Sequence, residues 1–416
     1  MKSLYYLLLF ILHLIINHTT AASQSIITTL PGYNDTRPFK LETGSRPAKG
    51  PVGALAHGGP GCSGFSGLVY EIGPLAFDFA TFDGSLPSLT INPYSWTKIA
   101  NIIFIDSPVG TGFSYVATSQ GYTSNDTEST KHNYAFLRKW LLNHPTFLKN
   151  RLYVVGDSYG GKITPMVALE IAKGVTDAKK DENEKVPYAH RMALISDEYY
   201  ELAKSSCRGD YMSPDSNNVQ CLYALRLIRE CTNLVRNAHI LEPNCLFISP
   251  KLDDLQWGQT FVIDDPIDLL LLSKREEPWC RDHNYVTSYV WANDETVQEA
   301  LHIRKGTKQE WQRCNNSISY ENDVESVFKY HQLLSEKGYQ VLAYSGDHDM
   351  RIPYMSTLKW IPALNLTVDD QWRPWTVELY TERYKNNEAY FTFATVKARE
   401  EEVIQRQSTN LKNVLQ

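Results

Sequence analysis

The segment Gly156-Asp157-Ser158-Tyr159-Gly160 constrains the fold of this chain more than any other feature of its sequence. It follows an apolar run with β-branched residues, Leu152 to Val155, and precedes a stretch of helical spacing, Lys162 to Lys173. Glycines on both sides of a serine permit a sharp strand-to-helix turn that lifts the hydroxyl above the carboxyl edge of a sheet. The pattern predicts a nucleophile elbow at Ser158. The alternative is an ordinary turn between a strand and a helix.

Short apolar runs alternate with stretches of helical spacing, which predicts an α/β fold with a central, mostly parallel sheet. The expected strands are residues 101–106, 152–155 and 339–344, and the expected helices are residues 128–143, 162–173 and 294–302. Between residue 190 and about residue 285 the alternation is lost and cysteines cluster. Such a loop-rich segment predicts a cap that is inserted over the sheet and held partly by disulfides.

The N-terminal residues predict targeting to the secretory pathway. Lys2 precedes an apolar run from Leu4 to Ile16, and small residues follow at 21–23. This is the layout of a signal peptide, here residues 1–22, so the mature domain is expected to span residues 23–416. An uncleaved anchor is the alternative, but the run is too short to cross a hydrocarbon layer of about 30 Å. We therefore expect a secreted or vacuolar protein without a stable membrane anchor.

The cysteines and glycosylation sequons agree with an oxidising compartment. Five of the seven cysteines lie within residues 207–280, and the odd count leaves at least one thiol unpaired. The sequons of the expected mature domain are at Asn34, Asn125, Asn315 and Asn365. The net charge of −6 comes without basic runs, so no surface for nucleic acid is expected. No histidine pair or cysteine quartet has ligand spacing, so neither a metal nor a cofactor is expected.

A glycine-rich loop, residues 57–64, lies about a hundred residues before the elbow. Hydrolases with an elbow place the other half of their oxyanion hole in such a loop, because glycine lets backbone N–H groups point at one spot. We expect the donors to be the amides of Gly59 and Tyr159. A structural turn is one alternative. A phosphate loop is the other, but Phe65 stands where that motif requires lysine.

A catalytic serine needs an orienting acid and a base, which hydrolases of this architecture supply after later strands, in that order. Asp349 is the candidate acid because it follows the predicted strand that ends at Tyr344. Asp347 is the rival, and either residue can simply cap a turn. The base is expected after the final predicted strand, residues 390–396, yet the sequence has no histidine beyond His348.

Taken together, these motifs resemble the serine carboxypeptidases, and among them the plant serine carboxypeptidase-like proteins that include acyltransferases using glucose esters. The matching segments are residues 30–33, 57–74, 105–115, 156–160, 291–294 and 344–349. The resemblance implies an α/β-hydrolase fold and acyl-enzyme chemistry on Ser158. It also implies that Asp349 is the triad acid and that the amides of Gly59 and Tyr159 form the oxyanion hole. The implied substrate is a peptide or an acyl-glucose ester.

The same resemblance assigns a substrate-binding group that recognises a carboxylate through hydrogen bonds. Its members would be His57, Gly58, Glu71 and Asp157. The peptidases usually have asparagine in place of His57 and glutamate in place of Asp157. Aspartate before the serine is more similar to the acyltransferase branch. The resemblance also implies the disulfides Cys62–Cys314 and Cys207–Cys221, and Cys245 with Cys280 completes the expected set, which leaves Cys231 unpaired.

Three departures from the family pattern affect the expected activity. Only residues 45–55 stand where the family has a strand pair before the glycine-rich loop, and the segment between Ala172 and Pro187 is shortened. The third departure is an atypical tail, residues 398–416, which begins Ala-Arg-Glu where the family has Gly-x-Gly-His. Loss of a triad member removes several orders of magnitude in rate. We expect impaired catalysis, with His348 or His57 as substitute bases; the alternative is a non-catalytic binding relative or a truncated variant product.

Overall fold

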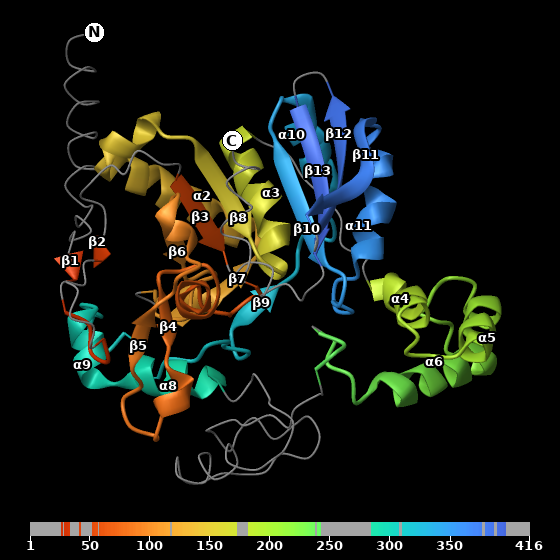
Figure 1. Ribbon diagram of the computed structural model, residues 1–416, viewed down its shortest axis with the longest axis horizontal. Helices are drawn as coiled ribbons and strands as arrows, with labels where there is room; N and C mark the ends of the chain where they lie inside the picture. Colours follow the sequence, from red (N-terminus) through yellow and green to blue (C-terminus); the bar gives the residue numbers. More distant parts are fainter. Residues whose placement is uncertain are drawn as a thin grey trace.

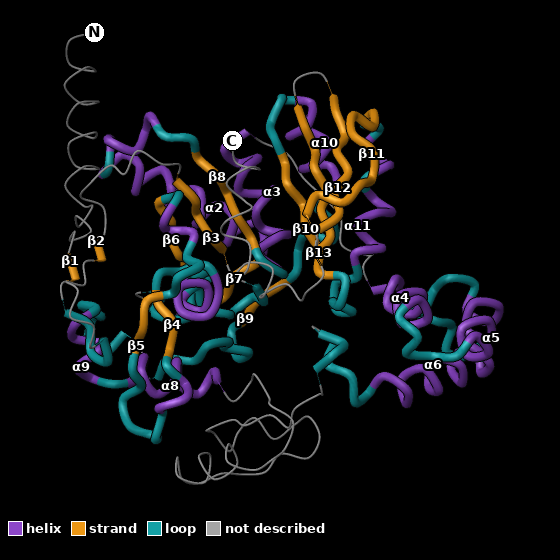
Figure 2. The backbone as a smooth tube through the Cα atoms, in the orientation of Figure 1, coloured by secondary structure: helices purple, strands orange, loops and turns teal. Residues whose placement is uncertain are grey.

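Figures 1 and 2 show the protein as a computed structural model of 416 residues. The structure describes residues 26–27, 29–33, 41–42, 52–56, 58–116, 119–172, 182–237, 239–242, 284–307, 310–376, 379–386 and 389–396. Several predictions fall outside these ranges: those for the signal peptide, Asn34, His57, Cys245, Cys280 and the tail from residue 398.

Three parallel strands form the sheet that leads to Ser158. Strand β3 (Val52–Ala56) lies in the centre, between β6 (Asn101–Ile105) and β8 (Leu152–Gly156). The first residue of β3 pairs with the first residue of each neighbour, so the three strands begin and end in register. Their carboxyl ends therefore meet at one edge, which is where open α/β sheets place their ligands.

Helices α2 (Asp126–Asn143) and α3 (Tyr159–Ala172) pack against this sheet, together with α10 (Phe328–Glu336). Helix α2 begins two residues before its predicted start because the side chain of Asn125 accepts a hydrogen bond from the Glu128 amide and caps the first turn. The buried residues of this core are Ala54, Leu137, Ile163, Met166, Val167, Leu169, Val324, Tyr330 and Leu334.

A second sheet has the strand order β10-β13-β12-β11. Strand β10 (Val341–Gly346) runs parallel to β13 (Ala389–Val396), and β12 (Leu379–Asn386) and β11 (Thr367–Thr376) continue it in antiparallel pairing. Helix α11 (Tyr354–Trp360) adds to its core. The buried residues there are Ile361, Leu364, Phe391 and Phe393.

The predicted α/β fold with parallel central strands is confirmed, and its hydrogen bonds divide these strands between two sheets. Side chains join the sheets where backbone pairing does not. Val155 of β8, Tyr344 of β10 and Val396 of β13 share one apolar cluster with Ile72 and Phe104. Because these residues lie near the carboxyl ends of their strands, the two sheets converge at the edge that carries the elbow. Figure 1 shows β8 and β10 on the facing sides of the two sheets.

Short strand pairs and helical turns make up the smaller elements of the described chain. The paired short strands are β1 (Ile26–Ile27) with β2 (Leu41–Glu42), β4 (Leu75–Phe77) with β5 (Leu89–Ile91), and β7 (Thr123–Asn125) with β9 (Ser319–Glu321). Short helical turns occur at residues 67–71, 79–81, 96–98, 119–122, 145–149, 182–184 and 362–364. The helix predicted at 294–302 is present as α9 (Glu295–Ala300). Helix α8 (Tyr285–Asn293) directly precedes it in the chain.

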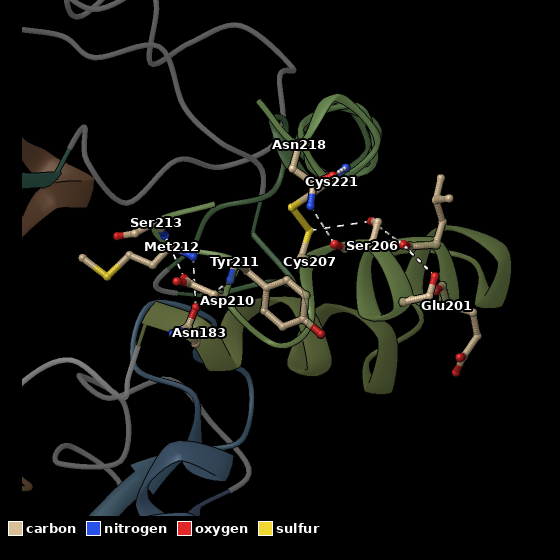
Figure 3. Close-up of a disulfide and its surroundings, with 12 residues drawn as sticks. Asn183, Glu201, Ser206, Cys207, Asp210, Tyr211, Met212, Ser213, Asn218 and Cys221 are labelled. Carbon is tan, nitrogen blue, oxygen red and sulfur yellow. Dashed lines mark hydrogen bonds between the residues drawn. A yellow bond between two sulfur atoms is a disulfide. The ribbon is translucent and has the colours of Figure 1, made fainter. Parts of the chain in front are cut away.

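Three helices come after α3 in the chain: α4 (Lys185–Arg191), α5 (Asp197–Cys207) and α6 (Val219–Thr232). Figure 3 shows the disulfide Cys207–Cys221, which joins the end of α5 to the start of α6. Cys62–Cys314 also forms, so both disulfides implied by the resemblance are confirmed. In the part of the chain that the structure describes, Cys231 is exposed and forms no disulfide. Among the described helices, none has the length and apolar character needed to cross a membrane.

Candidate active site

The backbone around Ser158 makes a strained turn between β8 and α3. Ser158 has φ of +51°, in the left-handed region that residues with side chains rarely adopt. The amide of Gly160 donates to the Asp157 carbonyl (2.7 Å), and the amide of Gly161 donates to the Ser158 carbonyl (2.9 Å). A Cβ atom at Gly156 would lie 2.1 Å from the Gly160 carbonyl oxygen, so this position requires glycine. The turn therefore has the backbone that a nucleophile elbow needs.

The glycine-rich loop lies directly against this serine. A Cβ atom at Gly58 would approach the Ser158 Cβ to 2.6 Å and the Ser158 Oγ to 3.1 Å. Gly59 has φ of +65°, and a Cβ atom at Gly61 would lie 2.3 Å from the Asn315 carbonyl oxygen. Glycine is thus required for close approach at two points of the loop. Two segments about a hundred residues apart in sequence meet at one hydroxyl.

Asp106 fixes this loop, and the sequence analysis did not assign it a role. Its Oδ1 accepts hydrogen bonds from the Ser63 hydroxyl (2.6 Å) and the Gly64 amide (2.9 Å), and its Oδ2 accepts one from the Phe113 amide (2.8 Å). The disulfide between Cys62 and Cys314 ties the same loop to a distant segment of the chain. The one sign of this role in the sequence was that Asp106 lies inside the matching segment 105–115. The sequence does not show which amides donate hydrogen bonds to the Asp106 carboxylate.

The predicted substrate-binding carboxylates are both buried. The Glu71 residue is 1% exposed, and Asp157, which precedes the serine, is 4% exposed. The Asn92 amide donates to the carbonyls of Glu71 (3.2 Å) and Gly73 (2.9 Å), which fixes the end of the short helix at 67–71. A buried carboxyl group is stable only where polar groups surround it. A site that binds the carboxyl group of a substrate through hydrogen bonds would provide such surroundings.

The two candidate acids follow β10 and have different surroundings. Asp349 is 2% exposed, and its Oδ1 accepts hydrogen bonds from the amides of Arg351 (2.6 Å) and Ile352 (3.1 Å). Burial raises the pKa of Asp349 from 3.8 to about 6, although these two bonds favour the ionised form. The Asp347 side chain is partly exposed, and its Oδ1 lies 3.7 Å from His348 Nε2. The enclosed carboxyl group is therefore Asp349.

The comparisons with known proteins cover nearly the whole chain. The family model described as serine carboxypeptidase matches residues 41–414. The chain belongs to the serine carboxypeptidase family. Serine carboxypeptidase-like 10 from Arabidopsis thaliana is 39% identical over 433 residues, which cover 94% of this chain and 92% of the relative. Serine carboxypeptidase-like 2 from the same plant is 38% identical over 434 residues, with 94% and 91% covered.

A solved structure supports the fold of this serine carboxypeptidase family member. Kex1(delta)p, a prohormone-processing carboxypeptidase from Saccharomyces cerevisiae, is similar with a TM-score of 0.58. The similarity covers 88% of this chain and 82% of that chain at 18% sequence identity. The predicted α/β-hydrolase fold is thereby confirmed. Family membership also supports the predicted class, a serine-type peptidase among the hydrolases.

In this member of the serine carboxypeptidase family, the end of β13 lies beside the loop that carries Asp347 and Asp349. Val396 pairs with Gly346, and its carbonyl accepts a hydrogen bond from the Asp347 amide (2.9 Å). The family's histidine would follow this point, and the residues that stand there lie outside the described ranges. His348, one expected substitute, packs its ring against His239, with centroids 5.4 Å apart, and its carbonyl accepts from the Ile240 amide (3.0 Å).

Three of the four sequons lie in described residues and differ in their surroundings. The Asn125 Oδ1 caps α2, as above. The Asn315 Nδ2 donates to the Gly110 carbonyl (3.2 Å), so the nitrogen that a glycan would use already has a partner. Asn365 is exposed and follows a short helical turn with φ of +54°. Among these three predicted acceptors, Asn365 is the one that is exposed.

Proposed function

We propose that this chain forms an acyl-enzyme on Ser158, in the hydrolysis of a C-terminal peptide bond or in acyl transfer from a glucose ester. The Ser158 Oγ attacks the acyl carbonyl carbon, and an amine or glucose leaves. Water or an alcohol then takes the acyl group, which is the one difference between hydrolysis and transfer. The contact between Gly58 and the Ser158 side chain carries this proposal, because it puts the glycine-rich loop beside the hydroxyl.

Each remaining residue of the proposed site has a part in this reaction. The amides of Gly59 and Tyr159 stabilise the oxyanion as the tetrahedral intermediate forms, and loss of one such donor costs about 3 kcal/mol. Asp349 is the triad acid. Glu71 and Asp157 bind the carboxylate of the substrate with His57 and Gly58, and their burial agrees with that role.

Catalysis by this chain is proposed to be weak. The sequence places Ala398-Arg399-Glu400 after β13, without the histidine that accepts the serine proton in the family. Loss of the base leaves the oxyanion hole and substrate binding, which still accelerate a reaction about 10³-fold to 10⁴-fold over water. The signal peptide pattern and the sequons support a secreted or vacuolar glycoprotein.

A non-catalytic binding protein is the second candidate function, favoured by the missing histidine and by the shortened segments at 45–55 and 173–186. Such a protein keeps the carboxylate pocket and binds a peptide or an acyl-glucose without turnover. A truncated variant product would have the same phenotype. Sequencing the 3′ end of the transcript distinguishes that case from a genuine tail.

A fluorophosphonate probe separates the two functions. The purified protein is treated with the probe, digested, and analysed by mass spectrometry, with Ser158→Ala as the control variant. An adduct at Ser158 that the variant lacks supports the acyl-enzyme proposal. A folded sample without an adduct supports the binding function. Circular dichroism and thermal unfolding of both proteins establish that the sample is folded.

A further inference from the structure

Asp126 is a buried carboxylate bonded to the first turn of α3, and the proposed acyl-enzyme chemistry does not use it. It is 0% exposed. Its Oδ2 accepts hydrogen bonds from the Lys162 Nζ (3.0 Å) and the Val324 amide (3.0 Å). Its Oδ1 accepts hydrogen bonds from the hydroxyls of Tyr320 (2.9 Å) and Tyr159. Four donors from α3, β9 and the turn after β9 thus meet at one carboxylate.

Two of these donors belong to the first turn of α3. Tyr159 directly follows Ser158, and Lys162 lies three residues later. The Lys162 side chain is 14% exposed, so its ammonium group and Asp126 form an ion pair that is largely removed from water. Burying such a charge is unfavourable without its counter-charge, which makes the pair a strong tie between α2 and α3.

The Tyr159 side chain has no other role in the described site. Its hydroxyl also lies 2.6 Å from the Asn322 Oδ1 and accepts a hydrogen bond from the Lys162 Nζ (3.4 Å), so its two acceptors, Asp126 and Asn322, lie on segments other than its own helix. Burial, and next the bond to Asp126, raise the pKa of Tyr159 far above its ordinary value. The phenol therefore stays a neutral donor throughout the physiological pH range.

The elbow needs such a tie because its backbone is strained. Ser158 has φ of +51°, and a residue with a side chain stays in this region only where its surroundings hold it there. Gly58 confines the side chain of Ser158 on one side. On the other side, the next residue is fixed through its hydroxyl to Asp126. Without that bond, the turn is free to relax and to carry the Tyr159 amide with it.

We propose that Asp126 is a positioning residue, which holds the Tyr159 backbone N–H at the oxyanion and keeps Ser158 in its strained conformation. This inference rests on the proposed function, because it concerns the same oxyanion hole. The competing explanation is that Asp126 only ties α2, α3 and the segment after β9 together. The two explanations differ in how they treat Tyr159 and Tyr320, since both donate to the same oxygen and only Tyr159 adjoins the elbow.

The decisive variants are therefore Tyr159→Phe and its matched control, Tyr320→Phe. Each removes one hydroxyl from Asp126 Oδ1 and leaves the ring in place. The labelling rate of Ser158 is measured over a range of fluorophosphonate concentrations, which separates the maximal rate constant kinact from the probe affinity KI. Positioning predicts that Tyr159→Phe lowers kinact about 10-fold to 100-fold with little change in KI. Tyr320→Phe keeps both values near those of the wild type.

Equal effects of the two variants on kinact, or no effect of Tyr159→Phe, overturn the inference. Asp126→Asn is the second variant, and it should lower kinact as Tyr159→Phe does. Since it also leaves the Lys162 ammonium without a counter-charge, its thermal unfolding is recorded alongside.

Hydrogen exchange of the peptide spanning residues 157–162 gives a readout that does not depend on labelling. Faster exchange there in Tyr159→Phe than in Tyr320→Phe supports positioning, and equal exchange overturns it. A wild-type protein that takes no probe refutes the proposed function instead, and the exchange data still decide whether Asp126 holds the elbow.

Discussion

Replacing Asp349 with asparagine should make the folded protein more stable at neutral pH. The carboxyl group is 2% exposed, and both of its hydrogen bonds, from the amides of Arg351 and Ile352, reach Oδ1. An asparagine side chain keeps an oxygen acceptor for these amides and carries no charge. The buried negative charge is therefore removed without loss of the two bonds.

The magnitude follows from the raised pKa of Asp349. Its value in the folded protein is about 6, against 3.8 for the exposed group. A folded-state pKa above the unfolded value means that the folded protein binds the proton more tightly, so ionisation disfavours folding. The stabilising effect of the protonated group is complete below pH 3.8 and is lost as the pH rises through 6. The whole difference is about 3 kcal/mol.

Urea unfolding of the wild type and Asp349→Asn between pH 4 and pH 8 measures this effect. All other groups titrate alike in the two proteins, so their contributions cancel in the difference between the two unfolding free energies. It should be small at pH 4 and should favour the variant by up to about 3 kcal/mol at pH 7. Most of the change should fall between pH 4 and pH 6.

A difference that does not vary with pH would refute this reasoning, because it would show that Asp349 titrates alike in the folded and unfolded chains. A variant that is less stable at pH 7 would refute it as well. That result would mean that a nearby cation, such as Arg351 or Lys185, stabilises the ionised carboxylate more than burial destabilises it.

Three further predictions test other parts of the structure. Gly58→Ala forces a Cβ atom to within 2.6 Å of the Ser158 Cβ, so we expect at least about a tenfold loss in fluorophosphonate labelling, measured against a thermal unfolding control; an unchanged rate would contradict the contact. Burial lowers the pKa of His331 to about 4, so its neutral form favours folding, and this stability is lost as the pH falls from 6.5 to 4. His331→Phe should remove about 3 kcal/mol of that pH dependence in urea unfolding, and equal slopes for both proteins would exclude it. In a secretory host, Asn365→Gln should remove a glycan by mass spectrometry and Asn315→Gln should not; a glycan on Asn315 would contradict the hydrogen bond of its Nδ2.

The elements that the sequence predicted well are those set by neighbouring residues. The elbow is an example, since Gly156 and Gly160 flank Ser158 and the strand and helix on either side are continuous in sequence. Helix α3 begins at Tyr159, before its predicted start at Lys162, because residues of the turn itself form the first helical turn. The two disulfides followed from family resemblance rather than from any local pattern.

The groups that hold the site together were not predictable in the same way. Asp106 contacts Ser63 and Gly64 across more than forty positions, and Asp126 contacts Val324 across 198 positions. Aspartate at either place is equally compatible with a helix cap, a turn or an exposed surface. The meeting of the glycine-rich loop with Ser158 was predicted from the elbow motif and the glycine-rich loop, and the distance at Gly58 came from the structure.

The sequence by itself determined the local backbone of the elbow and the family to which the chain belongs, because both depend on short motifs whose residues restrict φ, ψ and chemistry directly. The tertiary structure alone decided that the central strands form two sheets joined by side chains at Val155, Tyr344 and Val396. It also decided that Asp349 is the enclosed acid and that Asp126 collects four donors. Burial and long-range pairing depend on how distant segments fold against one another, and no local pattern of residues specifies that.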